Sequence, residues 1–462
     1  AKPQFSPRFG FNYKPFDDEN GSLQIRGGTG LFTGTPPYVW ISNQAGNNGV
    51  LFGDLNVRAV KDKNDNIISD GRPSLGFTGN MDTYKPAEGS ATRSDIAITD
   101  PDFKYPSLWK SNIAADYKFG DGWVATVELL YSKDINAIYH DNIGLYRTEQ
   151  FVNDGGAGNA RPYYNGYYSD REGNQKAANH VVMLRNTSKG HSLYTTFQLQ
   201  KNFVDGILKG LYLNGSYSFG QSRGVTDGTS SVATSAWKYR AALDGNAEEV
   251  GYTAGSFDGR LLLSASYTAN WSKYAATSFG LIYQRYRPFR YSYCYNGDAN
   301  GDSQFSNDLM YIPANFDEVK DHLLPGDFDS QEDAWKAMNA FIEQDPYLSK
   351  HRGEYAERNG AVAPFANQLD LSVSHDIKIY QKNGRSHTLR FSFNIANFLN
   401  LLNRNWGVVQ TTVLGNQQYQ FLTIPKGQGP SAANNYTLKY TMAKDLDETF
   451  KDNLNDVSRW QM

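Results

Sequence analysis

One segment of the chain has the residue types and the spacing of a calcium-binding loop. Asp298, Asn300 and Asp302 place oxygen-bearing side chains at alternate positions, and Asp308 follows a few residues later. Calcium takes six to eight oxygen ligands, and a D-x-N-x-D run supplies three of them from one tight turn. The sequence therefore makes these four residues candidate ligands of a calcium ion.

Two departures from the EF-hand pattern leave a second interpretation open. Ser303 stands where that pattern has glycine, and Leu309 stands where it has the bidentate glutamate. Asp and Asn side chains also stabilise turns by hydrogen-bonding to their own backbone. The alternative to a calcium loop is therefore a solvated, Asx-rich turn.

Motifs with catalytic spacing lack the context that catalysis needs. Residues 220–224 match G-x-S-x-G, but a nucleophile elbow requires a strand–turn–helix setting. The glycines around Gly28 lack both the G-x-G-x-x-G spacing and a following helix. None of the seven histidines forms an H-x-x-x-H pair. We predict that the chain is not an enzyme.

Ten longer segments alternate apolar and polar side chains. These segments must form the framework that positions the candidate calcium ligands. In the clearest, Leu193, Phe197 and Leu199 face one way, whereas Thr196 and Gln198 face the other. The segments run about nine to thirteen residues, and a tilted strand needs about 9–11 to cross a bilayer. The polar second face suits the wet lumen of a barrel. The predicted strands are 7–13, 22–32, 107–119, 122–134, 190–203, 209–221, 258–271, 274–287, 366–381 and 386–397.

Short turns join the strands within each pair, and long segments separate the pairs. Outer-membrane barrels are built this way, with the long loops outside. The predicted loops, treated as irregular, lie near 33–106, 135–189, 222–257, 288–365 and 398–457. Amphipathic rings favour the headgroup level, and aromatic residues mark the short-turn end at Phe119, Trp123, Phe203, Trp271, Tyr274 and Tyr380.

The composition excludes several classes of protein. The 462 residues are 39% hydrophobic and 14% aromatic, and no run of about 18 apolar residues exists, which excludes a spanning helix. The net charge is −3 and no dense block of basic residues occurs, so the sequence does not predict nucleic-acid binding. The single cysteine, Cys294, excludes an internal disulfide. The fold class predicted is all-β, an antiparallel transmembrane β-barrel with long extracellular loops.

One short loop helix interrupts the β pattern. Ser330 to Asp333 reads as a capping box with Asp in place of Glu or Gln, and Asp345-Pro346 ends the helix. Its apolar stripe is predicted to pack on its own loop rather than on a partner. The stripe consists of Trp335, Met338, Phe341 and Ile342.

Aromatic residues in the loops are the candidates for contact with a solute, because Tyr and Trp bring large contact area at low entropic cost. In a large barrel the loops must also pack on one another, so loop packing is the competing role for most of them. The candidates are Tyr38, Trp40, Tyr163, Tyr164, Tyr167, Tyr168, Trp237 and Trp406.

The ends of the chain lead us to expect a fragment. Residues 1–20 contain no signal peptide and no starting Met, and residues 458–462 read as the beginning of another strand. Lipid does not tolerate an open sheet edge. We therefore expect residues 1–462 to be the C-terminal part of a barrel, roughly strands 12 to 22 of about 22, a size class with a plugged lumen. The plug and the first-half strands would lie outside this chain.

A set of motifs spread over the chain points to one family. In this order the sequence resembles the TonB-dependent receptors of the outer membrane, specifically the Oar-like branch common in Bacteroidetes. The motifs are Arg26–Thr33, Pro37–Trp40, Ser42–Gln44, Tyr131–Asn136, Asn296–Asp302, Asn307–Pro313, Arg352–Gly360, Asn394–Asn403 and Ser458–Met462.

The resemblance implies a 22-stranded barrel in the outer membrane of a Gram-negative bacterium, with an N-terminal plug and energy supplied by the TonB complex. Neither the plug nor the TonB-contacting box is within these residues. Some relatives carry a surface lipoprotein over the barrel, although nothing in this sequence names such a partner. The partners expected are outer-membrane lipid, the TonB complex through the absent N-terminal region, and a surface lipoprotein or other envelope proteins.

Three functions remain open at this point. The first is TonB-dependent import of a large solute, such as a peptide, a glycan or a metal chelate, through a plugged barrel. The second is a passive, porin-like channel, and the third is a structural or assembly subunit of a larger outer-membrane complex. The sequence does not choose a substrate.

Overall fold

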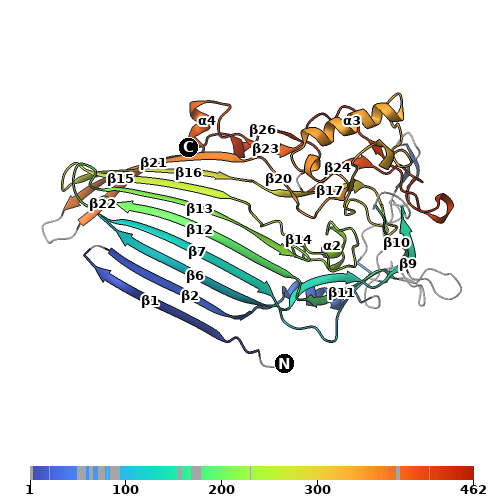
Figure 1. Ribbon diagram of the computed structural model, residues 1–462, viewed down its shortest axis with the longest axis horizontal. Coiled ribbons are helices and arrows are strands. Elements are labelled where there is room, and N and C mark those ends of the chain that lie inside the picture. Colours follow the sequence, from blue (N-terminus) through green and yellow to red (C-terminus); the bar gives the residue numbers. More distant parts are fainter. Residues whose placement is uncertain are drawn as a thin grey trace.

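Ten long strands form one antiparallel sheet in the computed structural model (Figure 1), in the order β1-β2-β6-β7-β12-β13-β15-β16-β21-β22. Each strand pairs with its sequence neighbour in the set, and the short β14 (Gly251–Tyr252) adds to β13. The structure describes residues 4–19, 21–48, 59–61, 66–70, 79–80, 82–83, 94–153, 159–167, 178–228, 230–380, 386–415 and 417–462.

The ten predicted strands are confirmed, with ends that differ by a few residues. Their bounds are β1 Arg8–Asp18, β2 Gly21–Thr33, β6 Ser107–Phe119, β7 Trp123–Asp134, β12 Gly190–Asn202, β13 Leu211–Gly224, β15 Arg260–Asn270, β16 Ala275–Tyr286, β21 Ala366–Tyr380 and β22 Ser386–Ile395.

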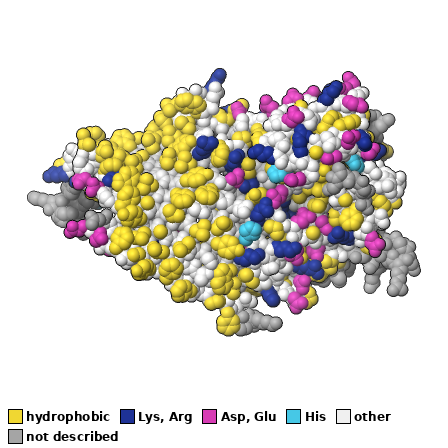
Figure 2. Space-filling model, in the orientation of Figure 1, with side chains coloured by type: hydrophobic (Ala, Val, Ile, Leu, Met, Phe, Trp, Pro, Cys, Tyr) yellow, Lys and Arg dark blue, Asp and Glu magenta, His cyan; other side chains and the backbone are white. Residues whose placement is uncertain are grey.

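The register keeps like side chains together across neighbouring strands. Phe197 of β12 lies opposite Val127 of β7 and Tyr217 of β13, whereas Thr196 lies opposite Ser218. Because a strand has a period of two, each strand contributes one row to an apolar face and one row to a polar face. Figure 2 shows hydrophobic side chains gathered over the strands and charged side chains gathered over the loop end.

Tight turns close the sheet at one end, and the long loops gather at the other (Figure 1). At the short-turn end, the rings of Phe119 and Trp123 stack with centroids 6.4 Å apart, and the side chains of Trp271 and Tyr274 are exposed. This placement fits the aromatic girdle that the sequence predicts. The predicted turn at 382–384 lies outside the described residues.

The long loops are not irregular, which corrects the prediction from sequence. Their described residues, here called the loop cap, carry short strands that pair with strands of other loops. In the first and second loops, β5 (Ser94–Thr99) pairs in parallel with β11 (Ala178–Thr187). In the fourth and fifth, β17 (Arg290–Asn296) pairs in parallel with β24 (Gln418–Thr423).

The other strands of the loop cap are short. Their bounds are β3 Ala59–Lys61, β4 Ile67–Asp70, β8 Ala137–Asn142, β9 Leu145–Val152, β10 Arg161–Tyr167, β18 Tyr311–Ile312, β19 Glu354–Tyr355, β20 Ala361–Val362, β23 Val409–Thr412, β25 Thr441–Met442 and β26 Phe450–Asn453.

A hydrophobic core holds the loop cap together. Tyr291 and Tyr293 of β17 are buried against Tyr419 and Phe421 of β24, and these two rings pack in turn against Phe341 of helix α3. Val152 of the second loop joins the same cluster. A core that draws on three loops makes the loop cap a folded body rather than a set of independent loops.

The predicted helix is confirmed as α3 (Gln331–Gln344). Ser330 Oγ accepts a hydrogen bond from Asp333 N–H at 3.1 Å and donates to the Asp333 carboxylate at 2.7 Å. Met338, Phe341 and Ile342 are buried in the core of the loop cap, where Phe341 packs against Tyr419 and Phe421 of the fifth loop, so the stripe does not pack on its own loop alone, which corrects the prediction from the sequence. Three shorter helices were not predicted: α1 Tyr38–Gly46, α2 Ala233–Lys238 and α4 Phe398–Leu402.

The outer edges of the sheet are β1 and β22. Within the described residues each pairs with one neighbouring strand only. Beyond β22, Gln461 exchanges backbone hydrogen bonds with Ala396 in an isolated antiparallel bridge, so the predicted strand start at 458–462 is reduced to one paired residue. In the part of the chain that the structure describes, no helix is long and apolar enough to cross a membrane.

Candidate functional site

The polar face of the sheet is a continuous hydrogen-bonded surface. Gln198 Nε2 donates to Asn214 Oδ1 at 2.7 Å, and the hydroxyls of Thr268 and Ser278 lie 3.0 Å apart. Further along the sheet, Arg26 Nε donates to Asp116 at 2.9 Å. Half-buried side chains that hydrogen-bond to one another make this face suitable as the wall of an aqueous lumen.

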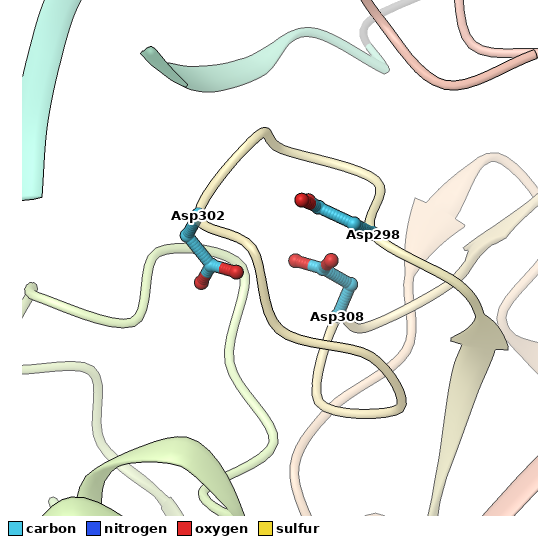
Figure 3. A group of neighbouring side chains, drawn as sticks. All are labelled: Asp298, Asp302 and Asp308. Carbon is cyan, nitrogen blue, oxygen red and sulfur yellow. The ribbon is translucent and has the colours of Figure 1, made fainter. Parts of the chain in front are cut away.

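The predicted calcium loop brings three carboxylates together (Figure 3). Ligand atoms of Asp298, Asp302 and Asp308 lie within 4.8 Å of one another. Asp302, Asp308 and Asn300 are buried, and Asp298 is half-buried. These residues connect β17 to β18 and contact the second loop, where Tyr164 N–H donates to Asn300 O at 2.7 Å.

Backbone amides hold the carboxylates in this arrangement. Asp298 accepts N–H bonds from Asn300, Gly301 and Ser303 at 2.6–3.2 Å. Asp308 Oδ2 accepts from Ala299 N–H at 2.8 Å. These bonds are those of an Asx-rich turn, but the turn is buried rather than solvated.

Burial and mutual repulsion disfavour negative charge on the carboxylates of residues 298–308, here called the acidic loop. Burial, followed by the nearby Asp308 and Asp298 carboxylates, raises the pKa of Asp302 well above its usual range. Burial also raises the pKa of Asp308 to about 7, against the opposing effect of Arg161. A cation among these oxygens would offset the mutual repulsion of the carboxylates.

Ser303 adopts the backbone conformation for which the EF-hand pattern uses glycine. Its φ is 64°, in the left-handed region that favours glycine. Serine therefore replaces the glycine of the EF-hand pattern at this position, but the backbone keeps the left-handed conformation. Leu309, in contrast, contributes no oxygen from its side chain, and the carboxylate of Asp308 comes from the preceding position.

Arg161 supports the acidic loop, although sequence analysis did not single it out. Its guanidinium is fully buried and donates to Asp308 Oδ1 at 2.6 Å and to the carbonyls of Leu309 and Leu243. Arg161 belongs to β10 in a different loop. Because it lies far from Asp308 along the chain, no short sequence motif connects the two residues. One of the three carboxylate charges is thereby paired within the protein.

The aromatic candidates for solute contact divide into two groups. Trp40, Tyr164 and Trp237 are buried in the loop cap, where Trp40 Nε1 donates to Ser230 O at 2.7 Å and Tyr164 Oη donates to Asp244 at 2.6 Å. This burial assigns them to loop packing, the competing role, because a solute cannot reach them in this structure. Tyr38 and Trp406 are exposed by 68% and 52%.

Of the remaining aromatic candidates, the structure describes only the side chain of Tyr163. Tyr163 is half-buried, and its ring packs 4.9 Å from that of Tyr436. Tyr167 belongs to β10, but its side chain and the whole of Tyr168 lie outside the described residues. The G-x-S-x-G residues end β13, with Ser222 opposite Ser192, so the strand–turn–helix setting is missing there.

A comparison with protein families decides what kind of sheet this is. Residues 1–434 match the family model described as the outer membrane beta barrel domain. The chain belongs to this family. The β-barrel fold class and the location in the bacterial outer membrane, both predicted from the sequence, are thereby confirmed.

Comparisons with individual proteins say less than the family model about this outer-membrane β-barrel domain. No curated protein matches its sequence. Two mutants of the ferric enterobactin receptor of Pseudomonas aeruginosa are similar at 9% and 8% identity, with TM-scores of 0.36 and 0.35. The FrpB iron transporter of Neisseria meningitidis is similar at 7% identity, with a TM-score of 0.30. Each similarity covers 85% of this chain but 34%, 34% and 43% of the solved chains, so the domain spans less than half of their length.

We predict that one buried histidine makes the loop cap of the β-barrel domain sensitive to acid. His140 in β8 is buried against the ring of Trp40, and burial, together with Arg240, lowers its pKa to about 4. Since the unfolded chain has a His pKa of about 6.5, it binds the proton first, and stability falls as pH drops from about 6.5 to about 4. The loss should be at most about 3 kcal/mol. Thermal unfolding followed by tryptophan fluorescence should show it.

The matched variant for this prediction is His140→Gln, which cannot titrate in that range. Its unfolding temperature should change less than that of the wild type between pH 6.5 and pH 4. Parallel pH profiles for the two proteins would contradict the assignment of a neutral, buried imidazole.

Proposed function

We propose that this domain forms part of the wall of a TonB-dependent outer-membrane transporter that imports a large solute. One observation carries the proposal. Strands long enough to cross a bilayer present an apolar face and a hydrogen-bonded polar face, under a folded loop cap. A wall of this kind needs no bond-making chemistry, since recognition belongs to the loops and passage belongs to the polar face.

The two open edges support a larger barrel. Among the described residues, β1 and β22 each have one edge without a partner strand, and unpaired N–H and C=O groups are not tolerated in hydrocarbon, so we infer that further strands pair with these edges in the membrane. We propose that strands outside these residues complete a barrel of about 22 strands, of which this sheet is the C-terminal part. A plug in the lumen and a TonB-contacting segment belong to the same proposal.

The test uses the full-length protein encoded by the gene. Its sequence should contain a plug and a TonB box, and the purified protein should bind the periplasmic domain of TonB by surface plasmon resonance. In planar bilayers it should show no steady open pore. A steady conductance without TonB binding would favour a porin-like channel. Stable co-purification with envelope proteins, with growth unaffected by deletion of the TonB box, would favour a structural subunit.

We also infer that the acidic loop binds calcium. Asp298, Asp302 and Asp308 supply carboxylates, and Asn300 supplies an amide oxygen, which is the oxygen donor set that calcium prefers. The buried and mutually repelling carboxylates favour a cation. Bound calcium would fasten the acidic loop and, through Arg161, the second loop beside it.

Calcium should therefore stabilise the loop cap. A ligand that binds only the folded state at 100 times its Kd adds about 2.7 kcal/mol of stability. Thermal unfolding of the detergent-solubilised protein, with calcium and then with a chelator, should show a higher transition temperature with calcium. Asp302→Asn should remove most of this difference, whereas Asp329→Asn at an exposed position should retain it. Equal transitions with calcium and chelator would exclude the site.

A further inference from the structure

Three arginines line a pocket in the loop cap that the acidic loop does not share. Arg240, Arg290 and Arg358 surround a cavity of about 180 Å³. Arg240 follows α2, Arg290 begins β17, and Arg358 precedes β20. Gln418 of the fifth loop lines the pocket as well, so the pocket lies where the third, fourth and fifth loops meet.

Two of these arginines are buried without an acidic partner. Arg240 and Arg358 are exposed by only 6% and 5%, and both donate to the carbonyl oxygen of Val225. Neither forms an ion pair in the part of the chain that the structure describes. The Nε atom of each is buried and has no hydrogen-bond partner among the described residues. The Glu249 carboxylate acts on both arginines, and that of Asp227 on Arg358, but in the described residues neither acid accepts a hydrogen bond from Arg240 or Arg358.

The other charged groups in the pocket wall are already satisfied. Arg290 pairs with Asp258 and lies over the ring of Tyr252 at 4.2 Å. Asp227 accepts from Ala254 N–H at 2.8 Å and from Asn359 Nδ2 at 3.0 Å. Among the groups that line the pocket, the buried donors without a hydrogen-bond partner therefore belong to Arg240 and Arg358.

An arginine does not lose its proton in a protein, so a buried guanidinium donor without a partner favours an acceptor, and an anionic acceptor most of all. Guanidinium groups match carboxylate and phosphate oxygens in geometry and in charge. A cavity of about 180 Å³ has room for an oxyanionic group.

We propose that this pocket binds an oxyanion, a carboxylate or a phosphate, and so recognises the acidic group of the imported solute. The identification with the solute rests on the proposed transport function, whereas the binding of an oxyanion does not. Arg240 and Arg358 supply the charge, and Gln418 at the start of β24 lines the same space.

The experiment measures the unfolding temperature of the full-length protein in detergent during titrations with inorganic phosphate and with acetate. Sodium chloride at equal ionic strength is the reference. The wild type should show a saturable rise with phosphate or acetate beyond that with chloride. The oxyanion that binds more tightly identifies the source, phosphate or carboxylate. Arg240→Gln and Arg358→Gln should each weaken the apparent affinity at least tenfold, and Arg404→Gln, at an exposed site, should not.

An isosteric variant keeps the test decisive if an arginine variant fails to fold. Gln418→Glu places a carboxylate in the pocket wall, so it should raise the unfolding temperature in chloride and weaken oxyanion binding at least tenfold. The proposal would be overturned if the unfolding temperature of the wild type showed no saturable rise with either oxyanion. It would also be overturned if Gln418→Glu bound the oxyanion as tightly as the wild type does. Oxyanion binding by a protein that does not bind TonB would refute the transport function and leave the pocket standing.

Discussion

Leu263→Arg should lower the free energy of unfolding by about 2–4 kcal/mol in a lipid bilayer. Leu263 lies near the middle of β15 on the apolar face, opposite Gly215 and Tyr283, and Leu199 and Leu281 surround it. A guanidinium there meets hydrocarbon instead of water. Chemical unfolding of the protein in lipid vesicles measures the loss.

The matched variant is Ser266→Arg on the opposite face of the same strand. Ser266 lies opposite Tyr212 and Gly280, and Asp370 lines the same hollow, so a cation remains solvated there. Its cost should be much smaller than that of Leu263→Arg. Equal costs, or the reverse order, would show that the assignment of the two faces is wrong.

Arg161→Met should destabilise the loop cap by about 3–5 kcal/mol, the usual cost of removing one partner from a buried ion pair. The variant leaves Asp308 buried without its cation, and it removes the donor to the Leu309 and Leu243 carbonyls. Limited proteolysis and thermal unfolding in detergent should both detect the change, since the loop cap would open before the sheet does.

Arg147→Met is the control for this effect. Arg147 also pairs with an aspartate, Asp244, at 3.0 Å, but its side chain is 52% exposed. Pairs of this kind contribute about 0–1 kcal/mol. The double variant Arg161→Met/Asp308→Leu should recover part of the lost stability, because it removes the stranded charge as well. Similar losses for Arg161→Met and Arg147→Met would contradict the role given to burial.

The sheet was predictable because its signal is local. In β12, the alternation of Leu193, Phe197 and Leu199 with Thr196 and Gln198 needs no knowledge of the neighbouring strands. Helix α3 was predictable for a similar reason, since its capping residue and its stripe lie within the same few turns. Helices α1, α2 and α4 contain too few turns to establish a period.

The loop cap was not predictable in the same way. Strands such as β17 and β24 pair across a long separation in the chain, and each is too short to show alternation. Tyr164 and Trp237 look like contact residues in a loop read alone, but the folded cap buries both. The acidic loop was predictable because its oxygen-bearing side chains are regularly spaced within one short segment. Arg161, Arg240 and Arg358, in contrast, acquire their roles only from tertiary contacts.

The central claim, that one face of the sheet contacts lipid and the other an aqueous lumen, can be tested by spin labels along β12. Single cysteines from 193 to 200 can be labelled in the presence of Cys294, because that thiol is fully buried and its burial raises its pKa. In lipid vesicles, labels at 193, 197 and 199 should be accessible to oxygen, and labels at 196, 198 and 200 to a water-soluble nickel complex. Equal accessibility to the nickel complex at all six positions would contradict the account.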